Sequence, residues 1–140
     1  MPVELRNNQR RKVDIRRLKK ISQVLLDEVG QGHRVLSVLL TDDAEMADLH
    51  ERWMGDPAPT DVLSFPAEGV GPAEEGLLGD IAISVETAAR RSPRNLMKEI
   101  ESYLVHGVLH LTGHDHARAA EKKRMWAEAR RLKQRIGKIS

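Results

Sequence analysis

The sequence has no cysteine and few aromatic residues. Because there is no cysteine among the 140 residues, disulfide bonds and thiolate metal ligands are excluded, and nitrogen and oxygen are the donors left for a metal ion. The aromatic residues are Trp53, Phe65, Tyr103 and Trp126. Modules that read RNA by stacking its bases usually carry more, so we expect any RNA contact to depend on shape and backbone, or on a ribosomal partner.

Long apolar runs are also missing. The sequence has no stretch of eighteen apolar residues and no charged-then-apolar amino terminus, so neither a membrane span nor a secretory signal is expected. A cytoplasmic location is the default expectation. The length is typical of a single domain, which we predict to cover residues 1–140.

The net charge of +2 hides a strong asymmetry along the chain. Residues 1–20 have a net charge of +6 and residues 117–140 of +7, whereas residues 21–116 have a net charge of −11. If the two ends fold near each other, they form a basic surface suited to phosphate backbones. The plainer alternative is that these charges only solvate helix faces.

Four of the six histidines lie within the eleven residues HGVLHLTGHDH, which span 106–116. On a helix, His106 and His110 are about 40° apart and roughly 5–6 Å apart between Cβ atoms, so both imidazoles can bind one ion. A single histidine on an apolar helix is usually a buried, hydrogen-bonded residue, but this clustering is hard to explain by packing. The motif therefore predicts a metal site.

Gly113 is the residue type that ends a helix through a left-handed turn, and such a turn can return His116 toward the same face. The predicted ligands are His106, His110 and His116. Three neutral nitrogens leave a fourth position for water, as in catalytic zinc sites, so we expect one Zn²⁺ per chain, with Ni²⁺ or Co²⁺ as alternatives. His114 lies in the turn and is either an exposed residue or a group that orients a ligand or faces the substrate.

Periodicity and capping residues predict alternating strands and helices. The expected strands are 3–7, 34–40, 60–66 and 78–84. The expected helices are 14–29, one from Thr41 or Asp42 to about Trp53, a short one to about Arg91, the histidine helix started by Ser92-Pro93, and 117–136. This order predicts an α+β fold, in which helices cover a small mixed sheet of about four strands and the metal-binding helix lies across it.

The histidine motif is close to the HExxH motif of zinc proteases, but Gly107 stands where the protease has its glutamate base. Together, PTDVLSFP (59–66), LGDIAIS (78–84) and HGVLHLTGHDH (106–116) instead resemble the YbeY family of bacterial metal-dependent endoribonucleases. The resemblance covers most of the chain, and the family's three ligand positions fall on His106, His110 and His116. It implies cleavage of single-stranded ribosomal RNA, in ribosomal RNA maturation and ribosome quality control. The ribosome or its proteins are the implied partners, and neither DNA nor a membrane is expected.

Two positions depart from the family pattern. The family often has Tyr-Arg before the glycine that precedes its PTDVLSF-like strand, whereas this chain has Trp53-Met54 there and Arg52 two residues earlier. A phosphate-binding role of that arginine is therefore not transferred to this chain. The family also commonly has tyrosine at the position of His114. The histidine of this chain adds a titratable nitrogen beside the predicted metal.

The catalytic base is not assigned by the sequence. Asp61, Asp80 and Asp115 are weak candidates for the proton acceptor. In their plainer roles, Asp61 bonds the preceding proline turn, Asp80 lies in a Gly-Asp turn at a strand edge, and Asp115 orients a ligand imidazole, which is the role we favour for it. By resemblance alone, Thr60 and Ser64 line the cleft.

Three functions follow from these observations. In the first, a zinc-dependent endoribonuclease uses metal-activated water or the Lewis acidity of the metal. The second is a ribosome-binding assembly factor with a mainly structural metal, which the absence of an arginine at Met54 favours and the three-ligand site disfavours. The third is a metal hydrolase of peptides or esters, which Gly107 disfavours.

Overall fold

The computed structural model describes residues 3–56, 60–67, 76–114 and 118–139. In chain order, the elements are β1 (Val3–Asn7), α1 (Ile15–Glu28), β2 (Val35–Thr41), α2 (Asp43–Met54), β3 (Val62–Pro66), β4 (Leu77–Ser84), α3 (Val85–Arg91), α4 (Leu96–Leu111) and α5 (Ala119–Gly137).

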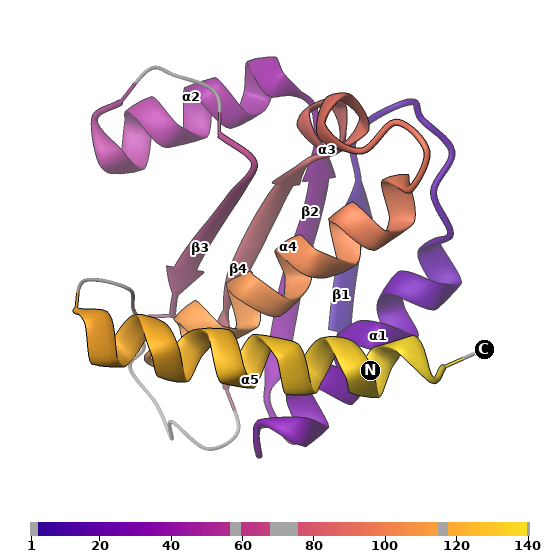
Figure 1. The fold of residues 1–140 in the computed structure, drawn as a ribbon. Helices are drawn as coiled ribbons and strands as arrows, with labels where there is room; N and C mark the ends of the chain where they lie inside the picture. The colour runs from indigo at the N-terminus through magenta and orange to yellow at the C-terminus, as the bar shows by residue number, and fades with distance from the viewer. Residues whose placement is uncertain (1–2, 57–59, 68–75, 115–117, 140) are drawn as a thin grey trace.

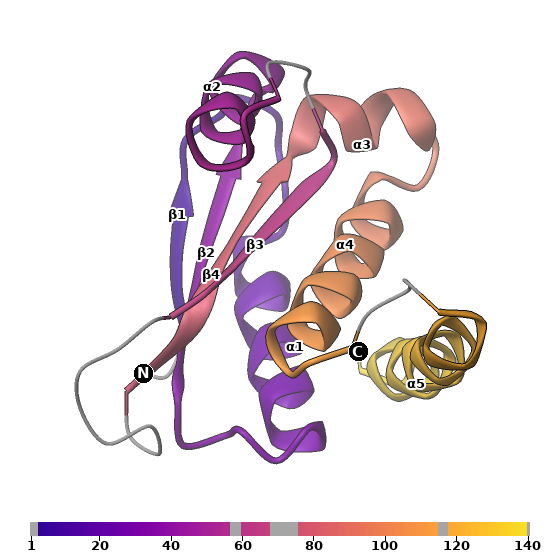
Figure 2. The same cartoon turned by 90° about the vertical axis from the view of Figure 1, so that its left-hand side faces the viewer.

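The strands form one mixed sheet in the order β1-β2-β4-β3. β1, β2 and β4 are mutually parallel, whereas β3 runs antiparallel to β4 with Ser64 opposite Ile81. α1 and α4 lie side by side on one face of the sheet, α5 lies outside them, and α2 lies on the opposite face (Figures 1 and 2). The predicted α+β class, with a small mixed sheet and the histidine helix across it, is confirmed.

Most of the core lies between the sheet and the helices on the α4 side. The spacing of Leu18, Ile21 and Leu25 on α1 buries all three side chains against the sheet and the neighbouring helices. A smaller cluster around Met46 of α2 and Leu63 of β3 covers part of the other face. None of the described helices combines the length and the apolar composition that crossing a lipid bilayer requires.

α4 packs closely against β4 because Gly107 has no side chain. A Cβ atom at this position would lie 2.7 Å from Cδ1 of Ile81, well inside van der Waals contact. The close packing therefore explains why glycine stands at the position where the zinc proteases have glutamate. A glutamate at position 107 would point into the sheet, and the histidines occupy other faces of the helix.

The predicted boundaries agree closely with the structure except at the start of α4. Ser92-Pro93 was expected to begin the histidine helix, but α4 begins at Leu96, with Asn95 as its cap residue. The backbone N–H of Asn95 donates to the carbonyl oxygen of Ser92 at 3.2 Å, so residues 92–95 form a turn. Proline at its second position suits the turn because its ring fixes φ there, and the same property had suggested a helix start.

The two basic ends of the chain lie next to each other. α1 and α5 are in contact, and Nη1 of Arg17 donates to the carbonyl oxygen of Ile139 at 2.7 Å. Nε of Arg17 also pairs with Oε2 of Glu101 on α4 at 3.1 Å. The condition for a shared basic surface, that the two ends fold together, is therefore met.

Candidate metal centre

His106 and His110 open onto a groove of about 720 Å³ between α4 and β3. α4 forms one wall of the groove with a stripe of side chains, and β3 with the residue before it forms the opposite wall. Those from α4 are Glu99, Ser102, Tyr103, His106 and His110, and those facing them include Asp61 and Ser64. The helical spacing of the two histidines therefore places both on one solvent-accessible wall.

The hydrogen bond of His106 determines which ring nitrogen is available to a metal. Its Nδ1 lies 2.8 Å from the carbonyl oxygen of Ser102, one turn earlier on α4. A carbonyl oxygen only accepts hydrogen bonds, so Nδ1 carries a proton, and in the neutral imidazole Nε2 is then the nitrogen with the lone pair. Metal-binding histidines commonly have their second nitrogen held in this way. The described part of the site therefore fits a metal ion.

The helix ends as the sequence predicted. Gly113 has a φ of +96°, and the backbone N–H of His114 donates to the carbonyl oxygen of Leu109 at 2.9 Å, which closes the last turn. His116, the third predicted ligand, and Asp115 lie outside the described residues. Within the described ranges, no three metal-binding side chains come together, so the three-histidine site stays a prediction.

His114 is partly buried and lies near Glu128 of α5. The pKa of Glu128 is lowered mainly by its hydrogen bond from Arg131, and the charge of His114 contributes to the same shift. The exposed position considered for His114 is therefore not what the structure has. Its neighbour is an acidic group on α5.

The candidate proton acceptors occupy different places. Asp61 lines the groove, but its Oδ1 accepts from the backbone N–H of Val62 at 2.8 Å and its Oδ2 pairs with Arg91. Asp80 was expected in a turn at a strand edge, but it lies within the central strand β4. Side chains alternate along a strand, and because Ile81 faces Gly107 of α4, Asp80 faces away from the histidines. Asp80 is therefore wrong as a proton acceptor for this site.

Glu99 and Tyr103 are groove residues that the motif analysis missed. They lie seven and three residues before His106, spacings that return to the same helix face, so the period of the helix was the signal that could have found them. Burial and the neighbouring Glu99 raise the pKa of Tyr103 to about 12. Its hydroxyl is buried beside Glu99 and Arg91, and the raised pKa keeps it protonated.

The structure also places the two departures from the family pattern. Met54 lines the groove, whereas Arg52 pairs with Asp48 one turn earlier on α2 and is not among the groove residues. Of the two residues expected to line the cleft, Ser64 does so, and its Oγ donates to the carbonyl oxygen of Gly107 at 3.4 Å. Thr60 is not part of the described lining, and its hydroxyl lies 3.4 Å from Oδ1 of Asp61.

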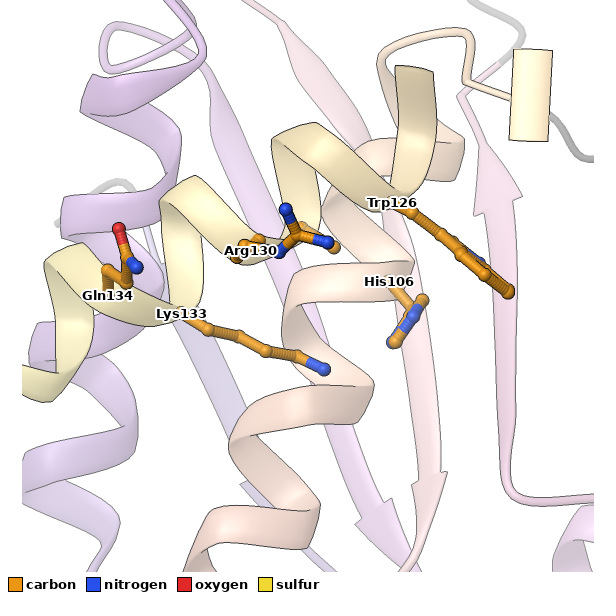
Figure 3. A pocket seen from close by; sticks show the side chains of 6 residues that line it. His106, Trp126, Arg130, Lys133 and Gln134 are labelled. Carbon is orange, nitrogen blue, oxygen red and sulfur yellow. The ribbon is translucent and has the colours of Figure 1, made fainter. Parts of the chain in front are cut away.

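His106 also forms the wall of a second hollow, on the side of α5 (Figure 3). Trp126, Arg130 and Lys133 of α5 surround this hollow. His106 therefore lies between the groove along β3 and a cationic helix.

Sequence comparisons identify relatives over nearly the whole chain. Residues 4–137 match the family model described as Endoribonuclease YbeY. A protein of that name from Thermobifida fusca is 40% identical over 138 residues, which cover 91% of this chain and 88% of the relative. Another from Acidothermus cellulolyticus is 40% identical over 142 residues, covering 91% and 86%. One from Mycolicibacterium vanbaalenii is 47% identical over 108 residues, covering 69% and 59%.

The fold has a counterpart among solved structures. The solution structure of TM1509 from Thermotoga maritima superposes with a TM-score of 0.62 and covers 96% of this chain and 88% of that protein. The two sequences are 23% identical, so the match concerns the fold alone.

Proposed function

Because the chain belongs to the endoribonuclease YbeY family, as its motifs predicted, we propose that it is a zinc-dependent endoribonuclease that cuts single-stranded RNA during ribosomal RNA maturation and ribosome quality control. We propose His106, His110 and His116 as the ligands of one zinc ion. The observation that carries this proposal is the pair of histidines on one wall of the groove, with Nε2 of His106 left as the available nitrogen.

When bound, zinc supplies Lewis acidity toward a phosphoryl oxygen and lowers the pKa of a water molecule. The protein's own residues then have separate tasks. The bond from Nδ1 of His106 to Ser102 holds that imidazole in its ligand orientation. The side chains of Ser64 and Tyr103 line the groove where an RNA strand would lie.

The proton acceptor is left unassigned. Asp61 is engaged by Arg91 and the backbone. Glu99 lies seven residues before His106, which corresponds to about 10 Å along the helix axis. At that distance we propose that Glu99 faces the bound strand or its associated water rather than the reacting phosphate.

The proposed substrate sets the expected partners and location. We propose single-stranded ribosomal RNA as the substrate and the ribosome or its proteins as the source of specificity. The protein would then act in the cytoplasm, where ribosomes are assembled. The basic helices α1 and α5, which lie side by side, support contact with a phosphate backbone.

The deciding experiment measures bound zinc and cleavage of a single-stranded ribosomal RNA fragment by the purified protein. We expect about one zinc per chain and RNA cleavage for the wild type. His110→Ala and His116→Ala should each keep the fold by circular dichroism, lose zinc, and lose cleavage. His33→Ala is the matched control, because His33 lies exposed in the turn after α1 and should change none of these readouts.

The two alternative functions predict other results. If the metal is mainly structural in a ribosome-binding assembly factor, His110→Ala unfolds the protein, and the wild type binds ribosomes without cutting RNA. If the protein hydrolyses another bond, the wild type cleaves peptides or esters, and His110→Ala abolishes that activity. Cleavage of RNA that survives removal of zinc would overturn the proposed metal role.

A further inference from the structure

The hollow between α4 and α5 has a volume of about 500 Å³ and is separate from the groove on β3. Figure 3 shows His106 on α4 and four side chains on α5 around it, namely Trp126, Arg130, Lys133 and Gln134. His106 is the residue that lines both the hollow and the groove. An extended ligand in the hollow would therefore continue directly into the candidate metal centre.

No carboxylate among the described residues neutralises the cations at the hollow. Arg131 and Arg135, on another side of α5, both pair with Glu28 of α1. In contrast, neither Arg130 nor Lys133 forms an ion pair with any residue that the structure describes. The positive charge at the hollow is thus available to an anionic ligand, whereas the charge beside Glu28 already serves to join α1 and α5.

Trp126 is not among the core residues that anchor its helix. Its residue surface is 56% exposed, whereas α5 is anchored in the core by Met125, Ala129, Leu132 and Ile136. Nζ of Lys122 lies 4.8 Å from the centroid of the Trp126 ring, so a cation already accompanies the indole. Proteins commonly bind single-stranded nucleic acids with an exposed aromatic ring beside unpaired cations. The bases stack on the ring, and the phosphates contact the cations.

We propose that this hollow is a subsite for single-stranded RNA, in which one unpaired base stacks on Trp126 and adjacent phosphates contact Arg130 and Lys133. The proposal rests on the proposed function, because the strand would pass from this subsite to the metal centre along His106. Double-stranded RNA would not bind in this way, because paired bases are not free to stack on a side chain. A single stacking residue selects an unpaired base without reading a sequence.

The test compares two strands of equal length, a single-stranded oligoribonucleotide and the same oligomer with abasic positions. Binding is measured by fluorescence anisotropy in EDTA, so that the strand stays intact. Trp126→Ala should weaken binding of the normal strand by about 5- to 150-fold, because stacking on one aromatic residue is worth about 1–3 kcal/mol. Binding of the abasic strand should not change, and Trp126→Phe should restore part of the affinity.

Removing positive charge from the hollow tests the phosphate contacts. The Arg130→Gln/Lys133→Gln double variant should weaken both strands and lower the slope of log affinity against log salt by about 1.4, at about 0.7 per phosphate contact. Arg124→Gln/Lys138→Gln is the matched control, because it removes the same charge from exposed positions on α5 and just after its end. Arg124 lies two residues from Trp126, about 200° around the axis, and so on nearly the opposite side.

The outcomes separate this proposal from the proposed function. Equal binding of the normal strand by wild type and Trp126→Ala would overturn the subsite, even if the wild type cuts RNA with zinc. Equal losses in the two double variants would overturn the specific phosphate contacts. Stacking on Trp126 in a protein that never cuts RNA would support the subsite and remove the proposed function. Binding that is absent for both strands would overturn the subsite in favour of another kind of partner.

Discussion

The carboxylate of Asp43, the first residue of α2, joins three elements of the fold. Its Oδ1 accepts from the hydroxyls of Ser84 and Thr87, and its Oδ2 pairs with Arg90. Burial by itself would raise the pKa of Asp43, but the hydrogen bonds from Ser84, Arg90 and Thr87 outweigh it, so the pKa is lowered below 3.8. The ionised form therefore stabilises the junction of α2, β4 and α3.

This shift has a defined consequence for pH. A carboxyl group with a lowered pKa in the folded state contributes full stability above its unfolded pKa and loses that contribution as the pH falls through its folded pKa. Asp43→Asn should lower the free energy of unfolding at pH 7 by about 1–2 kcal/mol. The difference from wild type should shrink below pH 3.8.

Urea denaturation between pH 7 and pH 3 measures this effect. Asp48→Asn on the same helix is the control, because Asp48 and its partner Arg52 are both about two-thirds exposed and their ion pair should contribute little. A loss for Asp43→Asn that is the same at every pH would contradict the role of the ionised carboxylate.

At the scale of the elements, the close packing of α4 on β4 depends on Gly107. A methyl group there would meet Cδ1 of Ile81 at 2.7 Å and two further atoms of that side chain at 3.0 Å. Gly107→Ala should therefore destabilise the protein by about 1–3 kcal/mol, although alanine has the higher helix propensity. It should also displace the wall that carries His106 and His110 and so weaken zinc binding.

Equilibrium unfolding and zinc affinity test this prediction together. Gly137→Ala is the matched control, because this glycine lies in the last turn of α5 and a Cβ atom there would have no neighbour within 4 Å. It should be neutral or stabilising. A neutral Gly107→Ala variant would show that the helix has room to move off the sheet.

At the scale of the whole molecule, Arg17 holds the first helix, the histidine helix and the end of the chain together. Its partner Glu101 is 8% exposed, and the ion pair is supplemented by the bond from Arg17 to the Ile139 carbonyl. Arg17→Met should cost about 2–3 kcal/mol, because it leaves a buried carboxylate without its partner. Arg17→Met/Glu101→Met should recover much of this loss, because no unpaired charge then remains.

A double-mutant cycle on unfolding free energies measures the coupling. The cycle on Arg52 and Asp48 serves as reference, since that pair is exposed and should give a coupling below about 0.5 kcal/mol. Strict additivity of the Arg17 and Glu101 variants would contradict a role for the pair in joining the three segments.

The elements were predictable because they follow local rules. Apolar spacing and caps such as Asp14 and Asp42, which each accept a backbone N–H in the first turn, mark α1 and α2 closely. The prediction that Ser92-Pro93 begins the histidine helix was wrong because proline suits both a turn and a first helical position. Which of the two forms depends on the following residues. The strand over 78–84 was predicted, but the placement of Asp80 in a turn at its edge was wrong, because a glycine and an aspartate together resemble a turn and only the pairing on both sides shows that Asp80 lies inside a central strand.

The sequence by itself determined the family, the helical pairing of His106 with His110, and the left-handed exit at Gly113, since all three depend on residue type and spacing along one segment. Only the tertiary structure decided that Asp80 faces away from the histidines, that Asp61 and Ser64 face them across the groove, and that His106 also borders Trp126. The physical reason is that sheet order and helix packing bring together residues from distant segments, and such contacts leave no periodic trace in the chain.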